Sequence, residues 1–241
     1  MRIGLLMLWL AVPVAAGFYH LGPGQKDLKN DITSLHLAKA VNYAAKEDWS
    51  VAQSYYAKAL ESLPDDRLAE RRQIRLERAK ALLNDSQLAP AYNELTELLE
   101  ELAGDQEADR QLVNEAKGTL AHAEYYLTWL LRLEGEPKEI WELEIESARQ
   151  TYRMLAEEAE KAGDTQAAQR QSEDLEAAIR LARMDLSELE ALALPSQCKG
   201  SKSGQCNCKG KKPGKKPSNG DKKSEDARGA SMGPPADGGG S

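Results

Sequence analysis

The stretch EDWSVAQSYYAKALESLP, residues 47–64, decides the class of fold. Its apolar residues recur at positions i, i+1, i+4, i+5, i+8 and i+9, which places them in one stripe along a helix. They are Val51, Ala52, Tyr55, Tyr56, Ala59 and Leu60. Because Pro64 cannot continue a helix, the pattern predicts a helix over 50–62. A helix of this length cannot bury its stripe alone, so we expect neighbouring helices to cover it.

Similar helical patterns extend outward from this stretch in both directions. Gly and Pro residues interrupt them, and we predict helices over residues 27–46, 50–62, 66–84, 88–103, 107–134, 138–162 and 165–192. Nothing in this part of the sequence alternates with period two, so we expect no strands. The connections are short, and neighbouring helices should therefore pack antiparallel. The predicted fold class is all-α.

Two turns carry capping signals. Ser86 is expected to cap the helix that begins at residue 88, with Pro90 in its first turn. Gly163 is expected to end one helix, and Asp164 to cap the next.

Small and aromatic residues around residues 47–64 follow a family-specific spacing. In a register that starts at Thr33, they are Ala40, Tyr43, Trp49, Ala52, Tyr56, Ala59 and Pro64. This spacing resembles the tetratricopeptide repeat (TPR), in which two helices cross at small residues. His36, Lys39 and Glu47 depart from the family pattern, which prefers Trp, Leu and Gly at these positions. A weaker copy follows 39 residues later, at Ala79, Leu82, Leu88, Ala91, Leu95 and Leu98.

The resemblance implies a short α-solenoid of stacked antiparallel helix pairs with a partner-binding face. In this family, peptides bind the concave face made by the first helix of each pair. The corresponding positions here are Ser34, Leu37, Val41, Ala44, Gln73, Leu76, Lys80 and Leu83. A carboxylate clamp used by some members would need a basic residue at 37 and Asn at 41, and this sequence has neither. We therefore expect a mostly apolar groove for a helix or an extended segment of another protein.

The N-terminal residues 3–21 are apolar apart from His20, and Arg2 precedes them. Their number is close to the roughly 20 residues that span a bilayer as a helix. We favour a single-pass transmembrane anchor with the body on the extracytoplasmic side. The alternative is a signal peptide cleaved after Ala16, which would leave a secreted or periplasmic protein.

The C-terminal residues differ in composition from the body. From Ser196 onward the chain has 10 basic and 4 acidic residues, whereas residues 23–192 have 21 basic and 35 acidic residues. An acidic body disfavours nucleic-acid binding there. Residues 195–241 are rich in Lys, Gly and Pro, which predicts a disordered tail. The tail contains Cys198, Cys206 and Cys208, whose spacing does not fit a zinc site. Disulfide bonding and inert thiols both remain open.

The sequence divides into five segments. They are an anchor or signal peptide (1–21), a linker with the start of the first helix (22–32), TPR-like repeats (33–103), further helical repeats with a capping helix (104–194) and the tail (195–241). The aromatic residues Tyr125, Tyr126, Trp129 and Trp141 are expected in the core rather than on a binding surface.

The sequence contains no recognised catalytic, nucleotide-binding or metal-binding motif, and its three His residues are not spaced as metal ligands. We therefore expect no catalytic residues, no cofactor and no metal. The expected function is that of a non-catalytic scaffold or adaptor for other proteins, tethered at a membrane through residues 3–21. The alternative is an anchored or secreted protein whose basic tail binds a polyanion, namely anionic lipid, cell-wall polymer or nucleic acid. The oligomeric state remains open.

Overall fold

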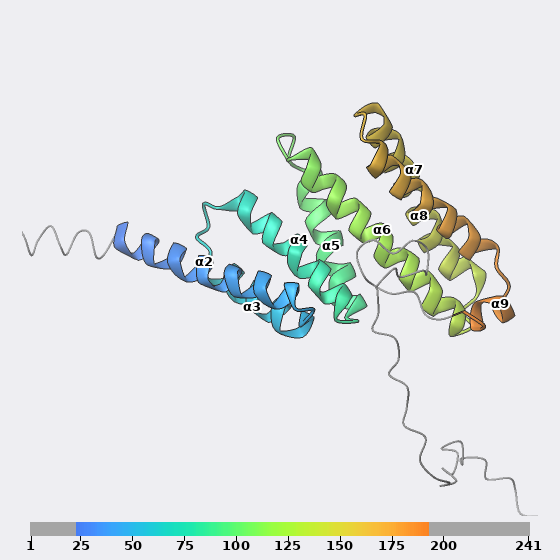
Figure 1. The fold of residues 1–241 in the computed structure, drawn as a ribbon, viewed down its shortest axis with the longest axis horizontal. Coiled ribbons are helices and arrows are strands. Elements are labelled where there is room, and N and C mark those ends of the chain that lie inside the picture. The colour runs from blue at the N-terminus through green and yellow to red at the C-terminus, as the bar shows by residue number, and fades with distance from the viewer. Residues whose placement is uncertain (1–22, 193–241) are drawn as a thin grey trace, which may run out of the picture. The chain divides into compact units, whose positions relative to one another are not determined.

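The computed structural model describes residues 23–192, which form eight helices and no strand (Figure 1). The prediction of an all-α fold is confirmed for this part of the chain. No helix within these residues has the length and apolar character that a membrane span requires. The expected membrane segment (3–21) and the expected disordered tail with its three Cys (195–241) lie outside the described residues.

The helix boundaries agree closely with those expected from the sequence. The helices are α2 (Pro23–Ala45), α3 (Trp49–Ser62), α4 (Leu68–Asn84), α5 (Leu88–Ala103), α6 (Arg110–Leu133), α7 (Lys138–Lys161), α8 (Thr165–Arg183) and α9 (Leu186–Glu190). Leu63, which precedes Pro64, is in an extended conformation and ends α3.

From α2 to α8, each helix packs mainly against the helices before and after it in the chain, and α4 also touches α6 (Figure 1). The buried residues form three clusters, in α2–α4, in α4–α6 and in α6–α9. Successive clusters share α4 or α6, so the packing continues across the division that the sequence suggests at residue 104. Tyr125 and Trp129 belong to the third cluster, as expected for core aromatic residues.

Buried alanines let α2 and α3 approach each other closely. Ala40 on α2 and Ala52 on α3 are fully buried, and Tyr56 fills the space beside them. At the corresponding positions 39 residues later, Ala79 on α4 and Ala91 on α5 are also fully buried. A larger side chain at any of these alanines would push the paired helices apart.

Four of the turns between helices share one backbone geometry. Each contains a residue with positive φ, followed by a residue whose N–H donates to the carbonyl five positions earlier. This is the Schellman arrangement that closes a helix C-terminus. The positive-φ residues are Glu47 (61°), Ser86 (62°), Gly135 (79°) and Gly163 (76°).

Two capping predictions have different outcomes. The prediction for Gly163 and Asp164 is confirmed, because the Asp164 carboxylate accepts a hydrogen bond of 2.9 Å from the Ala167 N–H. The prediction that Ser86 caps α5 is wrong. Ser86 instead takes the left-handed position after α4, and Gln87 precedes the first residue of α5.

The prediction of a single helix over 165–192 is also wrong, because the helix ends before Met184. This residue is extended (ψ 143°), and a separate short helix, α9, follows. Asp185 and Glu188 cap α9 reciprocally, and the Arg132 guanidinium donates to the carbonyls of Leu181 and Met184. These bonds satisfy backbone groups that a continuous helix would have paired internally.

Ion pairs join α4 to α5. Glu94 is only 6% exposed, and its carboxylate accepts hydrogen bonds from the guanidinium groups of Arg75 and Arg78, in each case with Nε at 2.9 Å. Arg72 pairs with Glu101 at 2.7 Å and with Asp105 at 2.6 Å. The polar side of the α4–α5 contact is therefore held by charge-assisted hydrogen bonds.

Candidate functional site

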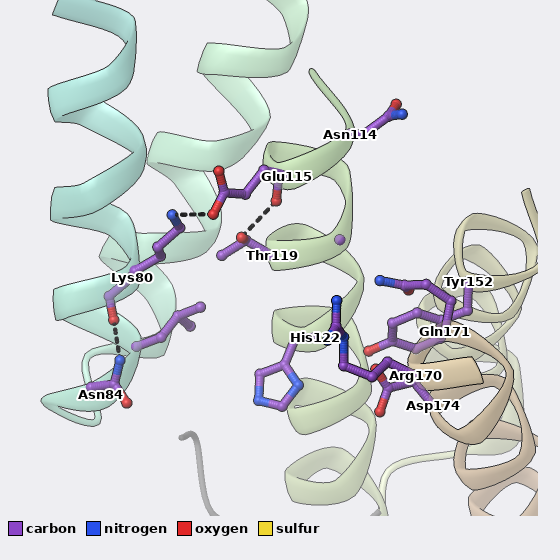
Figure 2. Close-up of a pocket in the computed structure, with 12 residues that line it drawn as sticks. Lys80, Asn84, Asn114, Glu115, Thr119, His122, Tyr152, Arg170, Gln171 and Asp174 are labelled. Carbon is purple, nitrogen blue, oxygen red and sulfur yellow. Dashed lines mark hydrogen bonds and ion pairs between the residues drawn. The ribbon is translucent and has the colours of Figure 1, made fainter. Parts of the chain in front are cut away.

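The described residues contain an open cavity of about 500 Å³ along α6, between α4 and α8. Eleven of its twelve lining residues lie on α4, α6 and α8, and α7 contributes only Tyr152. We call it the α4–α6–α8 pocket. Figure 2 shows Lys80 and Asn84 on one side of α6, and Tyr152, Gln171 and Asp174 on the other. The lining residues are Lys80, Leu83, Asn84, Asn114, Glu115, Gly118, Thr119, His122, Tyr152, Arg170, Gln171 and Asp174.

Gly118 on α6 is one of the residues that line the pocket. A Cβ atom at this position would lie 3.4 Å from Cδ1 of Leu155 and 4.0 Å from Nε2 of Gln171. The bare backbone of α6 therefore leaves room between α6, α7 and α8. A Gly in a helix interior costs about 1 kcal/mol relative to Ala, so its use here opens space at some expense in stability.

On the α4 side of the pocket, the ammonium group of Lys80 lies between two carboxylates. Nζ of Lys80 lies 2.6 Å from Oε1 of Glu77 and 2.7 Å from Oε1 of Glu115. Burial alone would lower the pKa of Lys80, but the hydrogen bonds to Glu115 and Glu77 outweigh it and raise this pKa above its ordinary value. Lys80 is therefore charged, and its charge is already compensated.

On the α6–α8 side, two polar atoms are buried without a hydrogen-bond partner among the described residues. Nε2 of His122 and Oε1 of Gln171 are both inaccessible to solvent, and neither has a hydrogen-bond partner among the described residues. Burial lowers the pKa of His122, so its imidazole is neutral at neutral pH. Unpaired buried polar groups cost about 1–3 kcal/mol each, so a ligand that one of these atoms meets after its side chain turns toward the pocket would recover part of this cost.

Asp174 brings a carboxyl group to the same side. Burial raises its pKa to about 7, and Glu173 adds to this, while Arg170 opposes it. No hydrogen bond reaches the Asp174 carboxyl from any residue that the structure describes. The neighbouring Tyr152 is buried, and its pKa is raised well above the ordinary value by burial and by the Asp174 charge.

The partner-binding residues expected on α4 have different surroundings. Lys80 and Leu83 line the pocket. Gln73 is exposed and donates to Glu77 at 3.4 Å. Leu76 is 0% exposed, because it lies in the core cluster of α4–α6.

None of the residues expected on α2 lines the pocket. Ser34 and Val41 are exposed, Val41 to 59%. Leu37 and Ala44 are half-buried and pack against the α2–α4 core cluster. The α2 residues therefore do not form one site with Lys80 and Leu83.

Sequence reasoning missed the α8 side of the pocket. Gln171 and Asp174 occupy helical positions in line with the buried residues Ala178 and Leu181, at spacings of three, four and three residues. Polar side chains in an apolar stripe are the signal that could have revealed them.

Another carboxyl group with a raised pKa, that of Glu124, is buried on α6 outside this pocket. Glu124 is 5% exposed, and its carboxyl accepts a hydrogen bond of 2.8 Å from the Ser147 hydroxyl, while Oε2 has no partner. Burial raises the pKa of Glu124 to about 7; the Ser147 hydrogen bond opposes this, and the nearby Glu144 charge adds to it. Among the described residues, no group of three or more His, Cys, Asp or Glu side chains could hold a metal ion.

No family model, curated protein or solved structure matches this chain. The α6–α8 side of the pocket brings together neutral His122, the amide of Gln171 and the carboxyl of Asp174. This set can bind a polar group by hydrogen bonds.

Proposed function

We propose that the protein is a non-catalytic adaptor whose helical body binds a positively charged segment of a partner protein, and that residues 3–21 hold it at a membrane. The membrane part of the proposal rests on the apolar sequence of these residues.

Correspondences at 39-residue intervals support a TPR-like repeat. Ala40 and Ala79 are both fully buried, and so are Ala52 and Ala91. In this register, α2 and α4 are the first helices of two successive pairs. If the pairing continues along the chain, α6 and α8 are the first helices of the next two pairs. The TPR-like binding face would then consist of the even-numbered helices.

The α4–α6–α8 pocket is the observation that carries the proposal. It opens between even-numbered helices, and Lys80 and Leu83, two of the residues expected at the binding face, line it. It also contains buried polar atoms without partners. A concave site with a few unpaired polar groups is the usual form of a binding site.

The charge distribution favours a basic partner. Residues 81–192 carry 10 basic and 26 acidic residues, a net charge of −16, whereas residues 23–80 carry 11 basic and 9 acidic residues. The pocket lies mostly in the acidic part. Such a field accelerates the association of basic segments and repels acidic ones.

Selection of short random peptides displayed on phage, with the full-length protein as bait, tests the proposal. The pocket is blocked by Thr119→Trp, and the matched control is Thr96→Trp on α5. Both hydroxyls donate to the carbonyl four residues earlier in their own helix, but Thr96 does not line the pocket. Circular dichroism confirms that both variants fold.

We expect the selected peptides to be basic and to lose binding to Thr119→Trp while they keep binding to Thr96→Trp. Binding should also weaken as salt rises, because charge attraction contributes to it. If no peptide is selected, or if Thr119→Trp binds the peptides as well as the wild type does, the proposed function is wrong.

A further inference from the structure

We infer that the α6–α8 side of the pocket, formed by His122, Gln171 and Asp174, receives one arginine side chain of the bound segment. The inference rests on the proposed function and names the chemical group that the pocket selects.

Four of the donor side chains in the pocket wall, all on α4 and α6, already donate within the protein. Lys80 donates to Glu77 and Glu115, as described above. Asn84 donates to the Lys80 carbonyl at 2.7 Å, and Asn114 to the Glu158 carboxylate at 2.7 Å. The Thr119 hydroxyl donates to the Glu115 carbonyl at 2.7 Å. These groups are therefore held in place by bonds within the protein, and at most one N–H of Lys80, Asn84 and Asn114 each is left for a ligand.

The acceptors on the α6–α8 side are not used in this way. Oε1 of Gln171 accepts no hydrogen bond within the described part of the chain. Burial and the charges of Glu173 and Arg170 act on the Asp174 carboxyl, with no hydrogen bond among these influences. Nε2 of His122 also has no partner, and it accepts when the neutral ring carries its proton on Nδ1. Arg170 also carries donors on this side, but it is exposed, so a ligand that supplies donors can take its place at these acceptors.

A guanidinium group matches this need better than other protein groups do. It presents five N–H donors in a plane and accepts none, and it is more weakly hydrated than an ammonium group. It would donate to Asp174 and, after a rotation of the amide, to Gln171. Lysine offers three donors from one point and should bind more weakly.

Arg170 is the competing charge at this site. It is exposed, it acts on Asp174 electrostatically, and Figure 2 shows it beside His122 and Asp174. An acidic ligand could pair with Arg170, but it would bring a negative charge close to Asp174 and leave the acceptors unsatisfied. The unused acceptors favour the arginine. Because Arg170 is exposed, it can turn to solvent when the ligand arrives.

The test uses one peptide from the phage selection in four versions, with Arg, Lys, citrulline or Glu at its basic position, and measures their dissociation constants for the full-length protein. Citrulline keeps the shape of arginine without its charge. We expect arginine to bind about tenfold or more tightly than citrulline, as is common for a paired buried charge, with lysine between them.

Asp174→Asn should abolish the preference for arginine over citrulline. This variant should fold, because it replaces a half-buried carboxyl group by a neutral amide of the same size. The matched control, Glu176→Gln, removes the same charge from an exposed position on α8 outside the α4–α6–α8 pocket and should keep the preference. The inference is wrong if Asp174→Asn keeps the preference, if both variants lose it equally, or if the Glu peptide binds best.

The test separates this inference from the proposed function. Peptides that are sensitive to Thr119→Trp but need no arginine overturn the inference alone, whereas failure to select any such peptide overturns both. A further variant replaces Lys209, Lys211, Lys212, Lys215 and Lys216 in the full chain with Gln. If it binds the arginine peptide about tenfold more tightly, the chain's own lysines occupy the pocket and the inference of a partner's arginine is wrong. Unchanged affinity supports the partner.

Discussion

Replacing Glu124 with Gln should stabilise the protein, and more so as pH rises. The pKa of Glu124 is about 7 in the folded protein, against an ordinary value of 4.5. The folded state therefore holds this proton more tightly than the unfolded state does, and stability falls as pH rises from about 4.5 to about 7. Because one pKa unit corresponds to about 1.36 kcal/mol, the full loss is about 3 kcal/mol.

Glutamine carries no charge at any pH and can still accept the hydrogen bond from Ser147. Near pH 4 we expect Glu124→Gln and the wild type to have almost equal stability, whereas near pH 8 the variant should be more stable by about 3 kcal/mol. Urea unfolding of both proteins, followed by the fluorescence of the buried Trp129 and its half-buried neighbour Trp141, measures this difference.

The control is Glu176→Gln, which replaces an exposed carboxylate and should change stability by less than about 0.5 kcal/mol at either pH. A stability difference between Glu124→Gln and wild type that does not grow with pH would show that Glu124 carries no buried charge. A variant that is less stable than wild type near pH 8 would show that hydrogen bonding by the carboxylate outweighs its burial.

Three further predictions concern the packing and the turns. Glu94→Ala should lower the free energy of unfolding by about 2–3 kcal/mol, because it removes a carboxylate that pairs with two partly buried arginines. The control Glu97→Ala removes an exposed carboxylate and should lower it by less than about 1 kcal/mol. Urea unfolding measures both differences. Glu47→Gly and Ser86→Gly should each raise stability by about 1 kcal/mol, because both residues have positive φ, which glycine adopts without steric cost. Thermal unfolding measures the change, and a fall in melting temperature would contradict the prediction. Leu98→Ala should cost about 3 kcal/mol because it empties a fully buried position; a loss below about 1 kcal/mol in urea unfolding would contradict it.

The helices could be predicted from the sequence because their apolar residues have a clear period and Gly or Pro residues separate them. Predicted and observed boundaries coincide for α5, at residues 88 and 103. The break at Met184 was missed although Asp185 and Glu188 form a capping box, because the apolar period continues through Leu181 to Leu189. Local capping outweighed periodicity there.

The pocket was harder to predict than the helices. The TPR-like register pointed to Lys80 and Leu83, which line it. It could not point to Gln171 or Asp174, because α8 lies beyond the part of the sequence that follows the register. Asp174 becomes notable only when folding half-buries it near Tyr152, and this electrostatic interaction between α7 and α8 depends on tertiary packing.

The stacking of each helix mainly on its neighbours in the chain has a consequence for how the protein forms. Few of the contacts require distant parts of the sequence to meet, so little entropy is lost in closing long loops before the contacts form. Each helix can dock as soon as the next one has emerged from the ribosome. The α2–α3 pair can thus pack while α8 is still being synthesised, and the α4–α6–α8 pocket is completed only after α8 has emerged.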